Sequence, residues 1–258
     1  MQHNNFYTFR FIAIITFVAS LLLALASTQL KELQEFNVEL DKKKNILKCI
    51  GKDLALLDAD AITKEYESNI RNIILNSNGD IAANIASENL ESVQNKSTGQ
   101  LNYFIDNVEY LPAYKSSNPE AFIIPISGKG LWSTLYGYFA LENDLNTVMG
   151  ITFYKHGETP GLGGEVEKKW FQNNFVGKKI FNQTGDLVSI KVVKGKVNDV
   201  YSGQALNHGV DGISGATITS KGVSYFLKRD LLKYEQYLKN NKNNECIEQP
   251  IRQFINSH

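Results

Sequence analysis

The chain has 258 residues, enough for one sizeable domain with an appendage or for two small domains. Its 27 basic and 27 acidic side chains balance, which argues against a general attraction to nucleic acid. Two cysteines, Cys49 and Cys246, lie far apart and form no C-x-x-C pair. This argues against an iron–sulfur cluster or a zinc site built from this chain alone, so no metal ligand is assigned. A disulfide between the two cysteines is the less favoured alternative.

The N-terminal segment is predicted to be a membrane anchor. Twenty consecutive residues without a charge run from Phe11 to Leu30, and 15 of them are apolar. About 20 such residues cross a bilayer as a helix. Ala24-Leu25-Ala26 matches the cleavage pattern of a signal peptide, but the apolar run is long for one, so a retained anchor is favoured. Charge does not settle its orientation, because Arg10 alone precedes the span and several lysines follow it.

The next segments predict helices. Apolar residues at helical spacing predict an amphipathic helix over residues 31–50 that continues from the anchor. Residues 60–76 predict a second helix. The polar composition of residues 92–100 predicts a loop. This stretch lacks the length and composition of a disordered linker.

The middle of the chain predicts strands. Three segments have strand composition with turns between them: residues 121–126, 131–141 and 148–154. Residues 187–193 are a further strand candidate. Residues 166–175 predict a short helix, and residues 221–239 a longer one with an apolar face. The order predicts an α+β fold, in which a transmembrane helix precedes a mainly antiparallel sheet with flanking helices.

The run from Asp211 to Ser220 joins turn-forming residues to closely spaced hydroxyls, among them those of Ser214, Thr217 and Thr219, just before the long predicted helix. One interpretation is an ordinary Asp-Gly turn that leads to a helix cap. The other is a close approach of an anion to the helix start, where a threonine hydroxyl carries a phosphoryl group. The residues alone leave both open.

A second run, residues 156–165, follows a predicted strand and holds three glycines within four residues: Gly161, Gly163 and Gly164. Such backbone turns sharply and can lie flat against a planar group, although a plain loop between strand and helix also accounts for it. His156 and Glu158 match the H-x-E half of the zinc deaminase signature. The P-C-x-x-C half is absent, which excludes that class.

Three motifs together carry a resemblance to a known family. They are D-x-x-S-G-A-T at residues 211–217, E-T-P-G-L-G at 158–163 and G-K-G-L-W-S-T-L-Y-G at 128–137. The first two resemble domains that carry FMN on threonine through a phosphoester bond. All three, behind an anchor, resemble the C subunits of the Na+-translocating NADH:quinone oxidoreductases. The resemblance covers most of residues 121–225 and the anchor.

The resemblance implies particular cofactor-binding residues. FMN would be esterified through its phosphate to Thr217. Asp211 would serve that modification or order the turn, and the close approach would be shaped by Ser214, Gly215 and Ala216. The isoalloxazine ring would lie against the glycine-rich loop formed by Glu158, Thr159, Gly161, Leu162 and Gly163.

It also implies a function as an electron-relay subunit that is not catalytic alone. The complex would be a translocase of the bacterial cytoplasmic (inner) membrane that couples electron transport from NADH to ubiquinone with sodium export. Partners would be its other subunits, a flavin transferase that uses FAD, and membrane lipid. The expected parts are a cytoplasmic N-terminus (1–10), the anchor (11–30), the juxtamembrane and N-terminal part of a periplasmic domain (31–120), the FMN-binding domain (121–240) and a polar tail (241–258).

Other enzyme classes lack their signatures here. No G-x-x-x-x-G-K-[ST] run and no full G-x-G-x-x-G run occur, which disfavours an ATPase site or NADH binding. A serine hydrolase is disfavoured because Ala216 replaces the last glycine of a nucleophile elbow and only His258 follows. Two alternatives stay open: a G subunit of the Rnf electron-transport complex, which shares two of the motifs, and a cofactor-free membrane-anchored scaffold.

Overall fold

The computed structural model describes the backbone of residues 5–255, and the side chains in that range except those of Asn5, Glu88 and residues 243–255. The chain divides into two compact units, Met1–Lys42 and Lys43–His258. The first unit holds most of helix α1 (Asn5–Cys49), whose side chains at positions 6–39 are all exposed. Within the described residues this is the one helix that is long and apolar enough to cross a membrane. It contains the predicted span.

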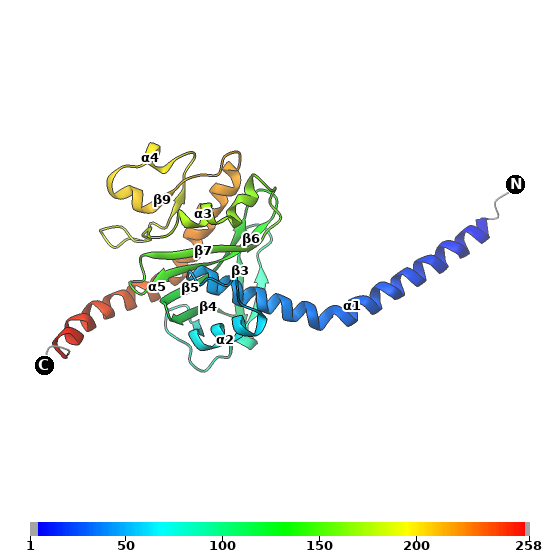
Figure 1. Cartoon of the computed structure of the whole chain (residues 1–258), viewed down its shortest axis with the longest axis horizontal. Coiled ribbons are helices and arrows are strands. Elements are labelled where there is room, and N and C mark those ends of the chain that lie inside the picture. Colours follow the sequence, from blue (N-terminus) through cyan, green and yellow to red (C-terminus); the bar gives the residue numbers. More distant parts are fainter. Residues whose placement is uncertain (1–4, 256–258) are drawn as a thin grey trace. The chain divides into compact units, whose positions relative to one another are not determined.

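The second unit is built on an antiparallel sheet of seven strands (Figure 1). Six of them lie in the order β2-β3-β4-β5-β6-β7, and β1 pairs with β4. The strands are β1 (Ile70–Leu75), β2 (Glu91–Gln94), β3 (Leu101–Ile105), β4 (Val108–Ser117), β5 (Glu120–Lys129), β6 (Thr134–Glu142) and β7 (Val148–Lys155). A short parallel pair follows, β8 (Lys191–Val192) with β9 (Gly209–Val210).

The helices of this unit flank the sheet. They are α2 (Ala59–Asn69), α3 (Lys169–Asn173), α4 (Val197–Val200) and α5 (Thr217–Ile255), with 3-10 turns at Ser87–Asn89, Gly163–Glu167 and Gly203–His208. Asp58 caps α2 by accepting a hydrogen bond from the Ala61 N–H at 2.8 Å. The mainly antiparallel α+β fold predicted from the sequence is confirmed.

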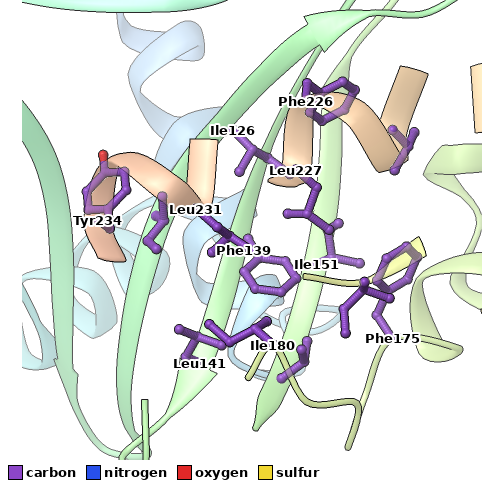
Figure 2. Close-up of a cluster of buried hydrophobic side chains, with 14 of the residues drawn as sticks. Ile126, Phe139, Leu141, Ile151, Phe175, Ile180, Phe226, Leu227, Leu231 and Tyr234 are labelled. Carbon is purple, nitrogen blue, oxygen red and sulfur yellow. The ribbon is translucent and has the colours of Figure 1, made fainter. Parts of the chain in front are cut away.

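The hydrophobic core lies between α5 and one face of the central strands. Phe226, Leu227 and Leu231 of α5 pack in one cluster with Ile126 of β5 and Phe139 of β6 (Figure 2). Their helical spacing places them on one face of α5. Gly128 of β5 lets the helix approach, because a Cβ there would lie 2.3 Å from the Phe226 Cβ. Gly128, the first residue of the third motif, therefore allows close packing of α5 on β5.

The end of α1, from residue 43 onward, belongs to the second unit and packs on the sheet. The Cys49 thiol is buried and donates to the Tyr138 carbonyl at 3.2 Å. Gly150 permits this contact, because a Cβ there would lie 2.3 Å from the Cys49 carbonyl oxygen. Burial raises the pKa of the Cys49 thiol well above its usual range. Cys49 is thus an unreactive free thiol, while Cys246 lies outside the described side chains.

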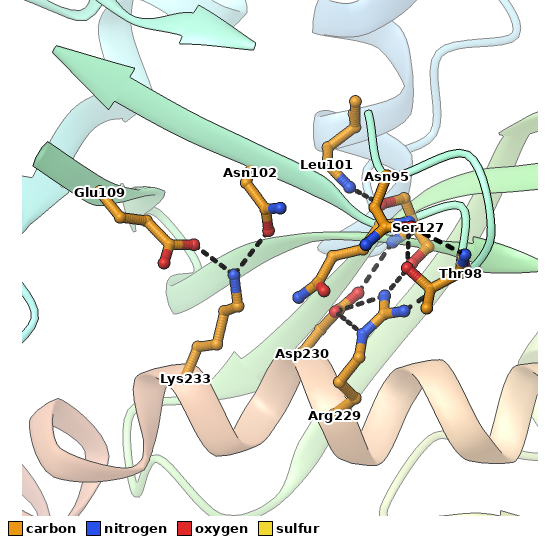
Figure 3. Close-up of polar contacts among 10 residues, drawn as sticks. Asn95, Thr98, Leu101, Asn102, Glu109, Ser127, Arg229, Asp230 and Lys233 are labelled. Carbon is orange, nitrogen blue, oxygen red and sulfur yellow. Dashed lines mark hydrogen bonds and ion pairs between the residues drawn. The ribbon is translucent and has the colours of Figure 1, made fainter. Parts of the chain in front are cut away.

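Polar contacts also fasten α5 to the sheet (Figure 3). Asp230 is buried and accepts from the Ser127 N–H at 2.9 Å and from the Arg229 Nε–H at 2.9 Å. One turn further, the Lys233 ammonium donates to Asn102 at 2.8 Å and pairs with Glu109. These bonds fix α5 relative to β3, β4 and β5, so the start of α5 has a defined place.

Several predicted elements differ from the structure. The strands predicted between residues 121 and 154 are confirmed as β5, β6 and β7. The helix predicted over 60–76 is wrong beyond Asn69, because Ile70–Leu75 pairs with β4. The loop predicted at 92–100 begins with three of the four residues of β2, and only two residues of the strand predicted at 187–193 form β8. The short helix at 166–175 is reduced to α3, whereas the long helix begins earlier and ends later than residues 221–239.

Candidate cofactor site

A cavity of about 1020 Å³ opens beside the start of α5. Its wall combines Gly161 of the glycine-rich loop with Ser214, Gly215 and Thr217 of the D-x-x-S-G-A-T motif. Other lining residues are 191–196, Trp170 and Tyr201. The fold thus brings together two motifs that lie about fifty residues apart in the sequence.

Thr217 is the first residue of α5 and its side chain is exposed on the cavity wall. The chain enters the helix through Gly215, whose φ of +73° is left-handed and favours glycine. The Ser220 N–H makes a helical bond to the Ala216 carbonyl at 2.9 Å. The N–H groups of residues 217–219 precede that bond and therefore have no partner within the helix. They form the electropositive end of the helix, next to the Thr217 hydroxyl.

Thr219 is in a different situation from Thr217. Its side chain is buried, with 1% of its surface exposed, and its hydroxyl donates to a Glu158 carboxylate oxygen at 2.7 Å. Of these two threonines, only Thr217 offers an accessible hydroxyl to the cavity.

Glu158 joins the E-T-P-G-L-G and G-K-G-L-W-S-T-L-Y-G motifs to the first turn of α5. Its carboxylate is buried and accepts the backbone N–H groups of Leu131 at 3.2 Å and of Trp132 and Ser133 at 2.9 Å, in addition to the Thr219 hydroxyl. Burial alone would raise the pKa of the Glu158 carboxyl, but these hydrogen bonds outweigh it and the pKa lies below its usual range. The carboxylate is therefore anionic at neutral pH.

Two glycines leave room for this carboxylate. A Cβ at Gly130 would lie 2.7 Å from one Glu158 oxygen, and a Cβ at Gly163 would lie 2.6 Å from the other. Glu158 and Gly163 were predicted to line the flavin ring, but the structure places neither among the residues that line the cavity. Their contacts instead hold the loops in place behind it.

Asp211 orders the segment around Lys196, which lines the cavity. Its carboxylate accepts the Val197 N–H at 2.8 Å and pairs with the Lys196 ammonium at 2.8 Å. The Lys196 hydrogen bond holds the pKa of the Asp211 carboxyl below its usual range, against the opposing effect of burial. Of the two roles predicted for Asp211, these contacts support the ordering of the chain around the turn.

Three further predicted residues, Thr159, Leu162 and Ala216, shape or contact the loops around the cavity. The Thr159 carbonyl accepts the N–H groups of Leu162 at 3.1 Å and Gly164 at 2.9 Å, which closes the glycine-rich turn. Leu162 is 43% exposed, and its Cδ2 would lie 2.6 Å from a Cβ at Gly215, so the two loops touch there. Ala216 is buried and, like Thr159 and Leu162, is not among the lining residues.

Several lining residues were missed by the sequence analysis. Ser220 lies three residues after Thr217, the last residue of the D-x-x-S-G-A-T motif, so helical spacing was an available signal. Trp170, Tyr201 and the lysines at 191, 194 and 196 carry no motif, and only the tertiary fold brings them to the cavity.

These residues fit a flavin that bears a phosphoryl group. The Ser220 hydroxyl is buried, lines the cavity and has no hydrogen-bond partner within the described part of the chain. Lysines at 191, 194, 196 and 221 also line the cavity, against one acidic side chain, Glu165. The helix end, the hydroxyl and the cations suit a phosphate, and Trp170 and Tyr201 offer aromatic surface to a planar ring.

Comparison with known proteins identifies the family. The model of a family described as the FMN-binding domain matches residues 130–231. A relative from Haemophilus ducreyi, named as the C subunit of a Na(+)-translocating NADH-quinone reductase, is 34% identical over 235 residues, which cover 86% of this chain and 87% of the relative. A relative of the same name from Neisseria meningitidis serogroup B is 35% identical over 224 residues, or 81% and 83% of the two chains.

A solved structure is also similar. The crystal structure of the corresponding C subunit from Parabacteroides distasonis aligns with a TM-score of 0.65 and 33% identity, and covers 81% of this chain and 96% of that one. The fold, the cavity and the family match together define an FMN-binding domain behind an apolar N-terminal helix. More particularly, the chain belongs to the family of C subunits of the Na(+)-translocating NADH-quinone reductases.

Proposed function

We propose that this chain carries FMN esterified to Thr217 and relays electrons within a Na+-translocating NADH:quinone reductase. The observation that supports this most directly is the contrast between two threonines at the start of α5. Thr217 is exposed on the cavity wall, whereas Thr219 is buried and bonded to Glu158. The modified residue must reach a separate transferase, and of these two threonines only Thr217 meets that need.

The residues around the cavity would hold the flavin in distinct ways. The N–H groups at the start of α5 would stabilise the phosphodiester charge, and Gly161 and Gly215 would keep the backbone close. Bound FMN supplies the redox chemistry, while the protein places it and sets its electronic surroundings. Glu158 would act behind the site, by holding the loops at fixed positions relative to α5.

The family also supports a setting for this activity. Its members are named as one subunit of a reductase, so the partners would be the remaining subunits, which exchange electrons with the flavin. The anchor at residues 11–30 would contact lipid of the bacterial cytoplasmic membrane and place the main domain on its periplasmic side. Sodium export and ubiquinone reduction would be properties of the assembly.

Mass spectrometry of the full chain tests this proposal. Co-expression with a flavin transferase should add the mass of one FMN less one water, on the peptide that contains Thr217. Thr217→Val should lose the added mass while the protein still folds, and Thr219→Val should keep it. Flavin that persists in Thr217→Val would refute the assignment, and an unmodified wild-type chain beside a modified control substrate would favour the cofactor-free scaffold.

A further inference from the structure

The hydroxyl of Ser220 is buried without a partner at the start of α5. Its side chain is 4% exposed, and no hydrogen bond to it exists within the described part of the chain. Its backbone is satisfied, because the N–H bonds to Ala216 and the carbonyl accepts from the Ser224 hydroxyl at 2.9 Å. A buried hydroxyl without a partner is unfavourable, and a ligand in the cavity that this residue lines would satisfy it.

Comparison with two other buried serines shows what distinguishes Ser220. The hydroxyls of Ser116 and Ser189 are also buried without partners, but neither residue lines the cavity. Ser220 does line it, and so does Thr217. Residues three apart lie on the same face of a helix, so Ser220 and Thr217 occupy the same side of α5.

The surroundings of Ser220 favour a negatively charged ligand. The unpaired N–H groups of the first turn of α5 carry partial positive charge. Lys191, Lys194 and Lys221 line the same cavity, and none of them forms an ion pair within the described residues. Lys196 is neutralised by Asp211, and the acidic Glu165 accepts a hydrogen bond from the Trp170 indole at 2.9 Å.

We propose that the unmodified chain already contains a binding site for a phosphoryl anion, in which the Ser220 hydroxyl donates to an anionic oxygen. The helix N–H groups bind the other oxygens, and the lysines supply a long-range field. The site captures the phosphoryl group of the flavin donor before the ester to Thr217 forms. Capture makes and breaks no covalent bond. Binding of phosphate to this site does not depend on the proposed function. The identification of the flavin donor as the physiological ligand rests on that function.

Titration of the full-length, flavin-free chain with inorganic phosphate tests the site. The chain is produced without a flavin transferase, purified in detergent and titrated calorimetrically at constant ionic strength, with chloride as the competing anion. Saturable binding is expected. Ser220→Ala should weaken it about tenfold, the loss expected for one hydrogen bond to a charged group. Ser189→Ala should bind as the wild type does, because its hydroxyl is equally orphaned but lies elsewhere.

The outcomes separate the two proposals. Wild-type protein that fails to bind phosphate, or Ser220→Ala that binds it equally well, overturns the anion site. Thermal melts of each variant exclude misfolding as the cause of a loss. Flavin attachment to Thr217 is measured in parallel by mass. Attachment without phosphate binding sinks this inference alone, whereas phosphate binding without attachment sinks the proposed function and leaves the site in place.

Discussion

The Thr219 hydroxyl donates a 2.7 Å hydrogen bond to the Glu158 carboxylate, across 61 positions of sequence. This bond connects the first turn of α5 to the glycine-rich loop. The same carboxylate binds the backbone of the Leu131–Ser133 turn, so three segments share one buried anion. A displacement of any one of them would be transmitted to the others, because the interior is closely packed.

Removal of this charge should destabilise the protein. Glu158→Gln replaces one acceptor oxygen with an amide that faces donor N–H groups, and we expect a loss of about 2 kcal/mol in the free energy of unfolding. Thr219→Val should cost about 1 kcal/mol, since it removes one donor. The double variant should lose less than the sum, because the two residues form one interaction. Urea unfolding of the full chain in detergent measures these values. Additive losses would show that the bond contributes nothing.

The pH dependence of stability should carry the signature of Glu158. Its folded-state pKa lies below the ordinary value of 4.5, so the carboxylate stabilises the folded state above that value. This contribution is lost as the pH falls from about 4.5 through the folded-state pKa. The difference in unfolding free energy between wild type and Glu158→Gln should therefore shrink in acid. Unfolding series between pH 7 and roughly pH 3 test this, and a constant difference would contradict it.

The sequence predicted some of this arrangement and could not predict the rest. Strands β5 to β7 and the face of α5 that packs on them were visible because strand composition and helical spacing are local signals. Strand β1 was not, because its Ile-rich residues take strand form only by pairing with β4, some forty positions later. The inward position of Glu158 depends on donors 25 to 61 residues away. The motifs contribute Gly161, Ser214, Gly215 and Thr217 to the residues that line the cavity, whereas Glu158 and Gly163 are not among them.

The approach of the two loops at Gly215 should be needed for flavin attachment. Gly215→Ala introduces a left-handed alanine and a Cβ that would lie 2.6 Å from the Leu162 side chain. Gly177→Ala is the matched control, because Gly177 has a φ of +77° and nothing within 4 Å of the added Cβ. Both should lose roughly 1 kcal/mol of stability to backbone strain. Only Gly215→Ala should reduce the flavin yield, measured by in-gel fluorescence; equal yields would show that the loop contact is dispensable.

Asp211 offers a way to separate ordering from a direct part in modification. Asp211→Asn removes the ion pair with Lys196 and weakens the acceptor of the Val197 N–H, whereas Lys196→Ala removes the ion pair only. Because Lys196 is 74% exposed, the pair itself should contribute less than about 1 kcal/mol to stability. If Asp211 orders the cavity wall, Asp211→Asn should lower the rate of flavin attachment in proportion to its loss of thermal stability, and Lys196→Ala should show a smaller loss of both. Abolished attachment in Asp211→Asn at wild-type stability would instead assign the carboxylate to the modification reaction, since an ordering residue cannot act without a change in the folded state.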